Sequence, residues 1–145
     1  MRLWHKDLIP VLPRQQLLSQ WRECCAIANS IATKGTPNHI LVNEILNYPM
    51  IHFVAYVDLV LNEMHERGYK VSEKSYTTLC KNLERGIDHF KVNFELSLIR
   101  DSGDVFMNWH NDRYLKQCFY NLQEKYDRGG IPDREWQKIK DGLTL

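Results

Sequence analysis

The chain has 145 residues, the length of one domain with a single hydrophobic core. Its apolar content of 43% and formal net charge of +1 are those of an ordinary globular protein, which excludes a disordered or strongly charged chain. No run of about eighteen apolar residues exists, and charges and prolines interrupt every early apolar run, so we expect neither a membrane span nor a signal peptide but a cytoplasmic protein.

Positive charge gathers at the start of the chain. The first forty residues carry a net charge of +3, which leaves −2 for the rest. The basic residues of this region are Arg2, Lys6, Arg14, Arg22 and Lys34. Such a distribution favours an anionic partner that touches one face, although an ordinary fluctuation in surface charge explains it equally well.

The four cysteines contain no CxxC pair, and the six histidines are scattered, so the sequence predicts reduced thiols and no metal site. We expect Cys24 to lie in the core.

Residues 2–12 contain Pro10 and are followed by Pro13, which predicts an extended N-terminal arm.

Pro13 suits the first turn of a helix, and apolar residues then recur at helical spacing, which predicts a helix over about residues 13–32. These apolar residues are Leu17, Trp21, Cys24, Ala28 and Ile31. The stretch "TKGTPN" (33–38) ends the helix, and "HILVNEIL" forms a short helical or irregular link.

A second helix is predicted from Pro49 to a C-terminal cap at Gly68; because it is apolar on most sides, we expect it to be the central, buried helix. A third is expected over 73–99 with a break near Gly86, followed by a turn at 101–104.

Asn111 or Asp112 caps a fourth helix that ends at "DRGG", and Pro132 opens a short last one. The sequence thus predicts an all-α, compact, single-domain helical bundle over residues 1–145, with the extended arm packed against the first helices.

One charged pair stands out on the first helix. On a helical wheel Arg22 and Glu23 lie opposite the apolar stripe, beside Gln15, Gln16 and Ser19. A solvated helix face is the simplest interpretation. However, an extended arm reaches about 35 Å, and the helix rises only about 15 Å from Pro13 to Glu23. The arm can therefore return the Met1 amine to this pair.

An α-amine there would be a useful nucleophile. Its ordinary pKa of about 7.7–8.0, against about 10.4 for lysine, leaves far more of it neutral at pH 7. A neighbouring carboxylate can move protons or stabilise a developing cation. The sequence therefore favours a site made of Met1, Arg22 and Glu23.

The stretch "QQLLSQWRE" resembles the first helix of the pyrimidine-dimer DNA glycosylases of the endonuclease V type, known from phages and algal viruses. The matching residues are Gln15, Leu17, Arg22 and Glu23. The resemblance continues at His39 and in "DLVLNEMHERGYKV", and it covers about residues 1–72.

This resemblance implies an all-α DNA-repair enzyme that acts as a monomer on UV-damaged double-stranded DNA, associated with the nucleoid. It implies that the α-amine of Met1 attacks C1′ of a damaged nucleotide and forms a Schiff base, that Glu23 is the acid/base group, and that β-elimination nicks the strand. Arg2, Gln15, Arg22 and Lys34 are then the DNA-binding residues. No metal or cofactor is implied, and a flipped nucleotide is expected.

Several features differ from the family pattern: Ala26 and "FVAYV" stand where the family has basic residues, and two further differences concern the proposed site. Classical members lose the initiator methionine and expose a threonine, but Arg2 normally blocks that removal, so we expect Met1 itself to serve. The family's aromatic tail has no counterpart in the sequence, and Trp109, His110 and Tyr114 are the candidates for its role. Two alternatives stay open: a non-catalytic helical DNA- or protein-binding domain, and an N-terminal-amine enzyme with another damaged base or a non-DNA carbonyl substrate.

Overall fold

The structure is a computed structural model that describes residues 1–85 and 104–143. Within these residues every regular element is helical, which confirms the all-α class. In chain order the elements are η1 (Lys6–Val11), α1 (Arg14–Lys34), η2 (Asn43–Asn47), α2 (Met50–Glu66), α3 (Glu73–Arg85), α5 (Asp112–Asp127) and α6 (Asp133–Gly142). The predicted helix beyond residue 85, its break at Gly86 and the start of the turn at 101 lie outside the described residues.

The helix ends follow the chain's breakers as predicted. Proline stands immediately before three helices, at Pro13, Pro49 and Pro132. Gly35 after α1 and Gly68 after α2 have φ angles of 74° and 76°, which glycine adopts without a steric penalty. Asn111 is the N-cap of α5, and its side chain accepts a hydrogen bond from the Tyr114 amide.

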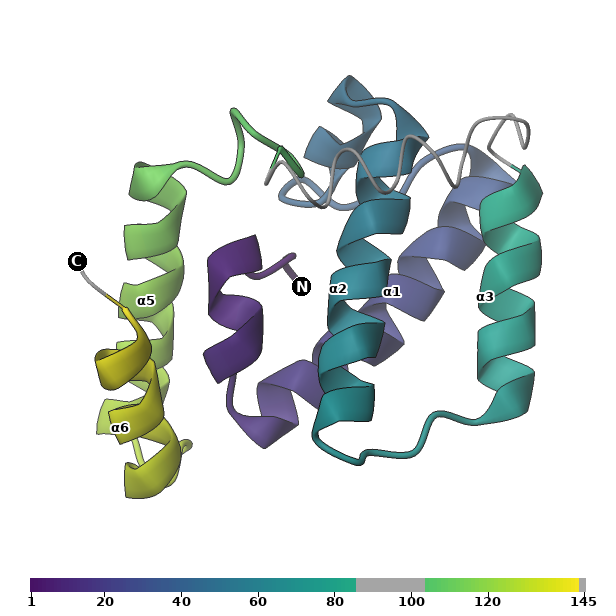
Figure 1. Cartoon of the computed structure of the whole chain (residues 1–145). Coiled ribbons are helices and arrows are strands. Elements are labelled where there is room, and N and C mark those ends of the chain that lie inside the picture. Colours follow the sequence, from purple (N-terminus) through teal and green to yellow (C-terminus); the bar gives the residue numbers. More distant parts are fainter. Residues whose placement is uncertain (86–103, 144–145) are drawn as a thin grey trace.

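The helices form two groups around the N-terminal segment. α1 packs against α2 and α3 on one side, and α5 packs against α6 on the other. Figure 1 shows η1 between the two groups, and η1 contacts both α2 and α6. The start of the chain is therefore part of the interior rather than an appendage.

The arm is not extended throughout, which corrects the prediction for residues 6–11. These residues form a 3₁₀ helix, which His5 caps by accepting a hydrogen bond from the Asp7 amide. Leu8 and Ile9 are buried, so the 3₁₀ helix directs both of these side chains toward the core. Residues 1–5, which precede η1, have no regular structure. The arm nevertheless folds back along α1.

Arg67 satisfies the carbonyl groups at the end of η1. Its guanidinium donates to the carbonyl oxygens of Leu12 (2.7 Å), Ile9 (3.2 Å) and Pro10 (3.2 Å). The same side chain is paired with Glu63 at 2.7 Å. The Arg-Gly-aromatic stretch at the end of α2 therefore fixes the N-terminal segment in place.

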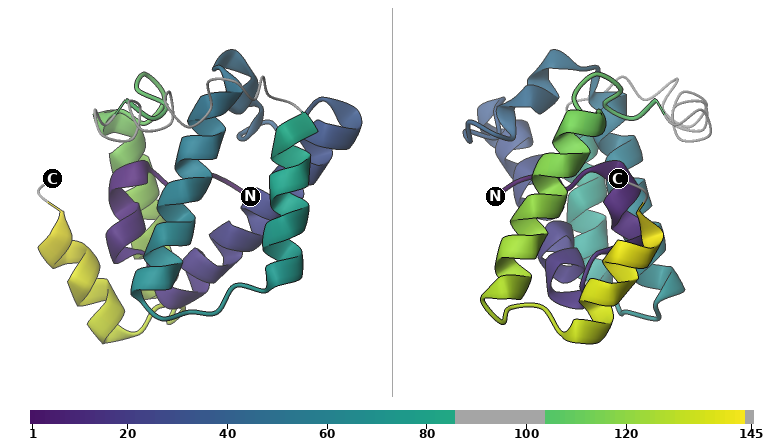
Figure 2. Two further views of the ribbon diagram at one scale, coloured as in Figure 1. Left: turned by 45° about the vertical axis from the view of Figure 1, so that its right-hand side comes forward. Right: turned by 90° about the vertical axis from the view of Figure 1, so that its left-hand side faces the viewer.

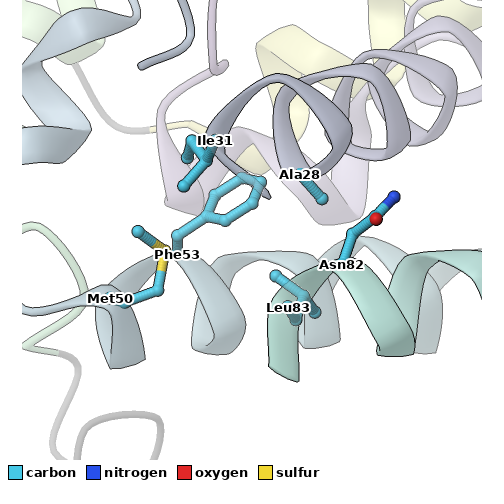
Figure 3. A pocket seen from close by; sticks show the side chains of 6 residues that line it. All are labelled: Ala28, Ile31, Met50, Phe53, Asn82 and Leu83. Carbon is cyan, nitrogen blue, oxygen red and sulfur yellow. The ribbon is translucent and has the colours of Figure 1, made fainter. Parts of the chain in front are cut away.

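The buried apolar residues of both helix groups belong to one hydrophobic cluster. Trp21 and Cys24 are buried as predicted, and α2 contributes the fully buried Phe53 and Tyr56. Where α1, α2 and α3 meet, six side chains close together and leave no cavity that water could fill (Figure 3).

All four cysteines are free thiols, and Cys24 is completely buried. In the described ranges no helix has the length and apolar character needed to cross a membrane.

Candidate active site

Side chains from three helices bind the backbone of residues 2–4. Gln20 of α1 accepts a hydrogen bond from the Trp4 amide (2.8 Å) and donates to the Arg2 carbonyl (3.1 Å). Tyr114 of α5 donates to the Leu3 carbonyl at 2.6 Å. The backbone of residues 2–4 is therefore held by the fold.

Tyr56 of α2 completes this network. Its hydroxyl lies 2.6 Å from the Trp4 carbonyl oxygen and 2.9 Å from Oε1 of Gln20, so its single proton serves one acceptor at a time. Gln20 and Tyr56 are both fully buried. Buried polar groups that are satisfied in this way fix one arrangement, because an unpaired alternative would be costly.

Glu23 lies at the solvent side of the network. The Nε2 group of Gln20 donates to Oε2 of Glu23 at 3.1 Å. Burial raises the pKa of the Glu23 carboxyl, and the charge of the Met1 α-ammonium opposes this most, followed by His39 and Arg22. Among the charges that lower the pKa of Glu23, the N-terminal amine thus has the largest effect. The arm is long enough to allow this interaction.

The predicted residues do not all come together. Met1, which is about half exposed, Arg2 and Arg22 surround Glu23. Arg22 is exposed and its guanidinium donates to Ser19 at 3.2 Å. Gln15 and Lys34 are exposed on the same helix but lie about 12 Å and about 16 Å along its axis from Glu23. They belong to the surface around the site rather than to the site itself.

A pocket of about 300 Å³ adjoins the N-terminal segment. It is lined by Arg2, Leu41, Trp109, Tyr114 and Gln117. The Arg2 guanidinium stacks over the Trp4 ring, with its central carbon 5.5 Å from the ring centroid. In the right-hand view of Figure 2 the chain start and the segment after α1 project on the same side of the molecule. Arg2 therefore connects the N-terminal segment to this pocket.

Of the three aromatic candidates for the tail's role, only two reach this pocket. Trp109 is half-buried and lines it together with Tyr114. His110 is instead buried, and its Nδ1 accepts a hydrogen bond from the Lys6 amide at 2.9 Å. His110 therefore supports the N-terminal segment from inside.

Sequence reasoning missed Gln20 and Tyr56, and it considered Tyr114 only as a candidate for the tail's role, not as a residue that binds the N-terminal backbone. A signal for Gln20 exists, because residues 17, 20, 24 and 27 repeat at a spacing of three and four, and Gln20 is the polar member of that buried stripe. Tyr56 and Tyr114 carry no such signal, since aromatic residues on buried helix faces are ordinary core residues.

Chemically, the site offers an amine and a carboxylate, and the pocket lined by Arg2 adjoins the same N-terminal segment. A neutral amine can attack an electrophilic carbon, and the carboxylate can accept or return a proton. Within the described ranges no cluster of three or more His, Cys, Asp or Glu residues could hold a metal ion.

The family model described as pyrimidine dimer DNA glycosylase matches residues 1–77, which include η1, α1, η2 and α2. No curated protein and no solved structure matches the chain.

Proposed function

The chain belongs to the pyrimidine dimer DNA glycosylase family, and from that premise we propose that it is a DNA glycosylase and abasic-site lyase that acts on UV-damaged DNA through the α-amine of Met1. The observation that carries the proposal is the buried network in which Gln20 binds the backbone of residues 2 and 4 and the Glu23 carboxylate together. The Met1 ammonium also acts electrostatically on that carboxylate.

The first proposed step is a displacement at carbon. The neutral Met1 nitrogen attacks C1′ of the damaged nucleotide, a nitrogen–carbon bond forms, and the bond from C1′ to the base breaks. Loss of a proton from the attacking nitrogen and opening of the sugar ring give the Schiff base. Glu23 is the group placed to take that proton and to return it to the ring oxygen.

The second proposed step breaks the strand. Removal of a proton from C2′ of the Schiff base expels the 3′ phosphate by β-elimination, and water then releases the enzyme from the sugar. Neither step needs a metal or an added cofactor, because the imine itself is the electron acceptor.

The electrostatics of Glu23 suit this sequence. The Met1 ammonium opposes the burial that raises the pKa of Glu23. When the amine loses its proton, that opposing charge disappears and the carboxylate becomes a stronger base. The carboxylate thus gains basicity in the state in which the amine is ready to attack.

The damaged strand has to reach the amine. A base in a regular duplex is stacked, so the target nucleotide must leave the stack before C1′ is accessible. Arg22 is exposed next to Glu23 and Arg2 lines the adjoining pocket, so both can meet the phosphates of a distorted strand.

The proposal is tested with two duplex substrates, one containing a single cyclobutane pyrimidine dimer and one containing an abasic site. We expect nicking of both and a covalent adduct with each when borohydride is present. Adducts with the abasic duplex alone would support a lyase for another damaged base. Binding without nicking or adducts would support the non-catalytic DNA-binding alternative.

A further inference from the structure

We infer that Gln20 is a positioning residue that joins the N-terminal amine and the Glu23 carboxylate into one unit. The inference deepens the proposed function, on which its catalytic part rests. Its structural part stands on contacts alone, since one fully buried amide binds the backbone of residues 2 and 4 and the carboxylate together.

The orientation of the Gln20 amide is determined by its neighbours. The Trp4 amide is a donor, so the Gln20 atom 2.8 Å from it must be the oxygen. The nitrogen then faces two acceptors, the Arg2 carbonyl and Oε2 of Glu23, each at 3.1 Å. A flipped amide would set donor against donor and acceptor against acceptor, so only one orientation is stable.

This orientation has a consequence for Glu23. The Gln20 N–H group donates to Oε2 and the Arg2 amide also hydrogen-bonds to the carboxylate, so two donors restrict the orientation of Glu23. A hydrogen bond from a neutral donor also favours the ionised carboxylate, which is the form that accepts a proton.

It also has a consequence for Met1. Gln20 binds both sides of Leu3, at the Arg2 carbonyl and the Trp4 amide, and so holds the backbone that leads to Met1. The Met1 ammonium acts electrostatically on Glu23, to which Gln20 is also bound. Gln20 therefore holds in one place the backbone that carries the amine and the carboxylate with which the amine interacts.

Three substitutions separate positioning from simple structural support. Gln20→Met keeps the side-chain volume and loses every hydrogen bond. Gln20→Glu keeps the acceptor for the Trp4 amide but loses the donor to Glu23. Gln123→Met makes the first change at an exposed position of α5 and is the matched control.

The pKa of Glu23 is measured by carbon NMR in each folded variant, and adduct formation with an abasic duplex is timed in parallel. We expect both Gln20 variants to raise the pKa of Glu23 and to slow adduct formation about ten- to a hundredfold, as loss of a hydrogen bond to a charged group implies. The groups that face Glu23, namely the Met1 amine, Arg2 amide, Arg22 and His39, are unchanged in Gln20→Met, whereas Gln20→Glu also adds a carboxylate whose charge raises the pKa of Glu23. Gln123→Met should match the wild type in both measurements.

The outcomes distinguish the proposed function from the inference about Gln20. If the wild type forms no adduct but the Gln20 variants still raise the pKa of Glu23, the proposed function fails and the structural part of the inference stands. An adduct rate or a Glu23 pKa in folded Gln20→Met equal to that of the wild type overturns the inference. Should neither Gln20 variant fold, the wild-type Gln20 side-chain amide resonances decide, because they must shift as Glu23 titrates and lose that shift in Glu23→Gln.

Discussion

At the scale of single residues, the most informative group is a carboxylate kept half-buried beside an amine. Burial raises the pKa of Glu23, so the folded protein binds a proton there more readily than the unfolded chain. The ionised form consequently costs stability above the folded-state pKa, and that cost disappears as the pH falls toward the ordinary value. A group that costs stability and is nevertheless held by Gln20 fits a functional role better than a structural one.

Glu23→Gln tests that reasoning. We expect the variant to lose strand nicking and adduct formation, because an amide does not accept the proton. We also expect a higher free energy of unfolding than the wild type at neutral pH, since the desolvation cost is gone and the new amide oxygen can accept from Gln20. The difference should shrink as the pH falls through the folded-state pKa of Glu23. Urea unfolding at several pH values and a nicking assay measure both effects.

The contrary outcome is clear for each effect. A Glu23→Gln protein that nicks an abasic duplex at the wild-type rate removes Glu23 from the chemistry. A variant that is less stable than the wild type at neutral pH shows that the carboxylate is structural. Asn29→Gln, an exposed change on the same helix, is the control for both assays.

The sequence predicts this site in part. Periodicity assigns Trp21 and Cys24 to the core and Arg22 to the surface, as the structure has them, because each lies well inside its face of α1. Gln20 lies at the edge of the apolar stripe, where polarity and position conflict. Its burial depends on the backbone of residues 2–4, and no pattern within α1 reports on that segment.

At the scale of elements, the N-terminal segment shows what local rules leave out. Prolines and glycines predict where α1, α2 and α6 begin and where α1 and α2 end, since those signals act over a few residues. The 3₁₀ turn of η1 depends instead on Arg67, which is distant in sequence and binds two carbonyl groups of η1 and that of Leu12, the residue after it. The conformation of η1 therefore cannot be predicted from the local sequence alone.

Arg67→Met should destabilise the fold. The change removes the donors to the η1 carbonyl groups and leaves Glu63 unpaired where both side chains are largely buried, at 14% and 13% exposure. We expect a loss of about 2–4 kcal/mol in the free energy of unfolding by urea.

The chain offers a matched control in α5. Arg128 and Glu124 form a pair with the same spacing but with 78% and 65% exposure, so Arg128→Met should change stability by less than about 0.5 kcal/mol. Equal losses in the two variants would contradict the role given to Arg67. The double variant Arg67→Met/Glu63→Gln should recover part of the loss, because the uncompensated carboxylate is then removed.

At the scale of the whole molecule, the two helix groups meet around buried histidines next to the N-terminal segment. His5 and His110 stack with their ring centroids 5.1 Å apart, and both are almost fully buried. Burial, together with the neighbouring charges of His5 and Lys6, lowers the pKa of His110 to about 2. Burial also lowers the pKa of His5, although Asp7 opposes it. Both rings are therefore neutral in the folded protein near neutral pH.

This arrangement predicts loss of stability in acid. Below about pH 6.5 the unfolded chain takes up protons on these histidines and folded His110 does not, so the free energy of unfolding falls as the pH falls. His110 alone contributes about 1.4 kcal/mol per pH unit in that range. In His110→Gln the amide oxygen can still accept from the Lys6 amide. The slope of the free energy of unfolding against pH should be smaller in this variant, by the amount that corresponds to about one proton. Identical slopes in the two proteins would show that His110 titrates in the folded state.

The central claim is that the Met1 amine is the nucleophile and works with Glu23. The most direct measurement is borohydride reduction in the presence of an abasic-site duplex, followed by peptide mass mapping. We expect the adduct on the α-nitrogen of Met1, and none after N-terminal acetylation or addition of one glycine before Met1, because acetylation removes the lone pair and the glycine displaces the amine. The competing nucleophiles are Lys6, whose ammonium lies 3.2 Å from Asp7, and Lys34, at the far end of α1. An adduct on either lysine, at full yield in the acetylated protein, would contradict the account.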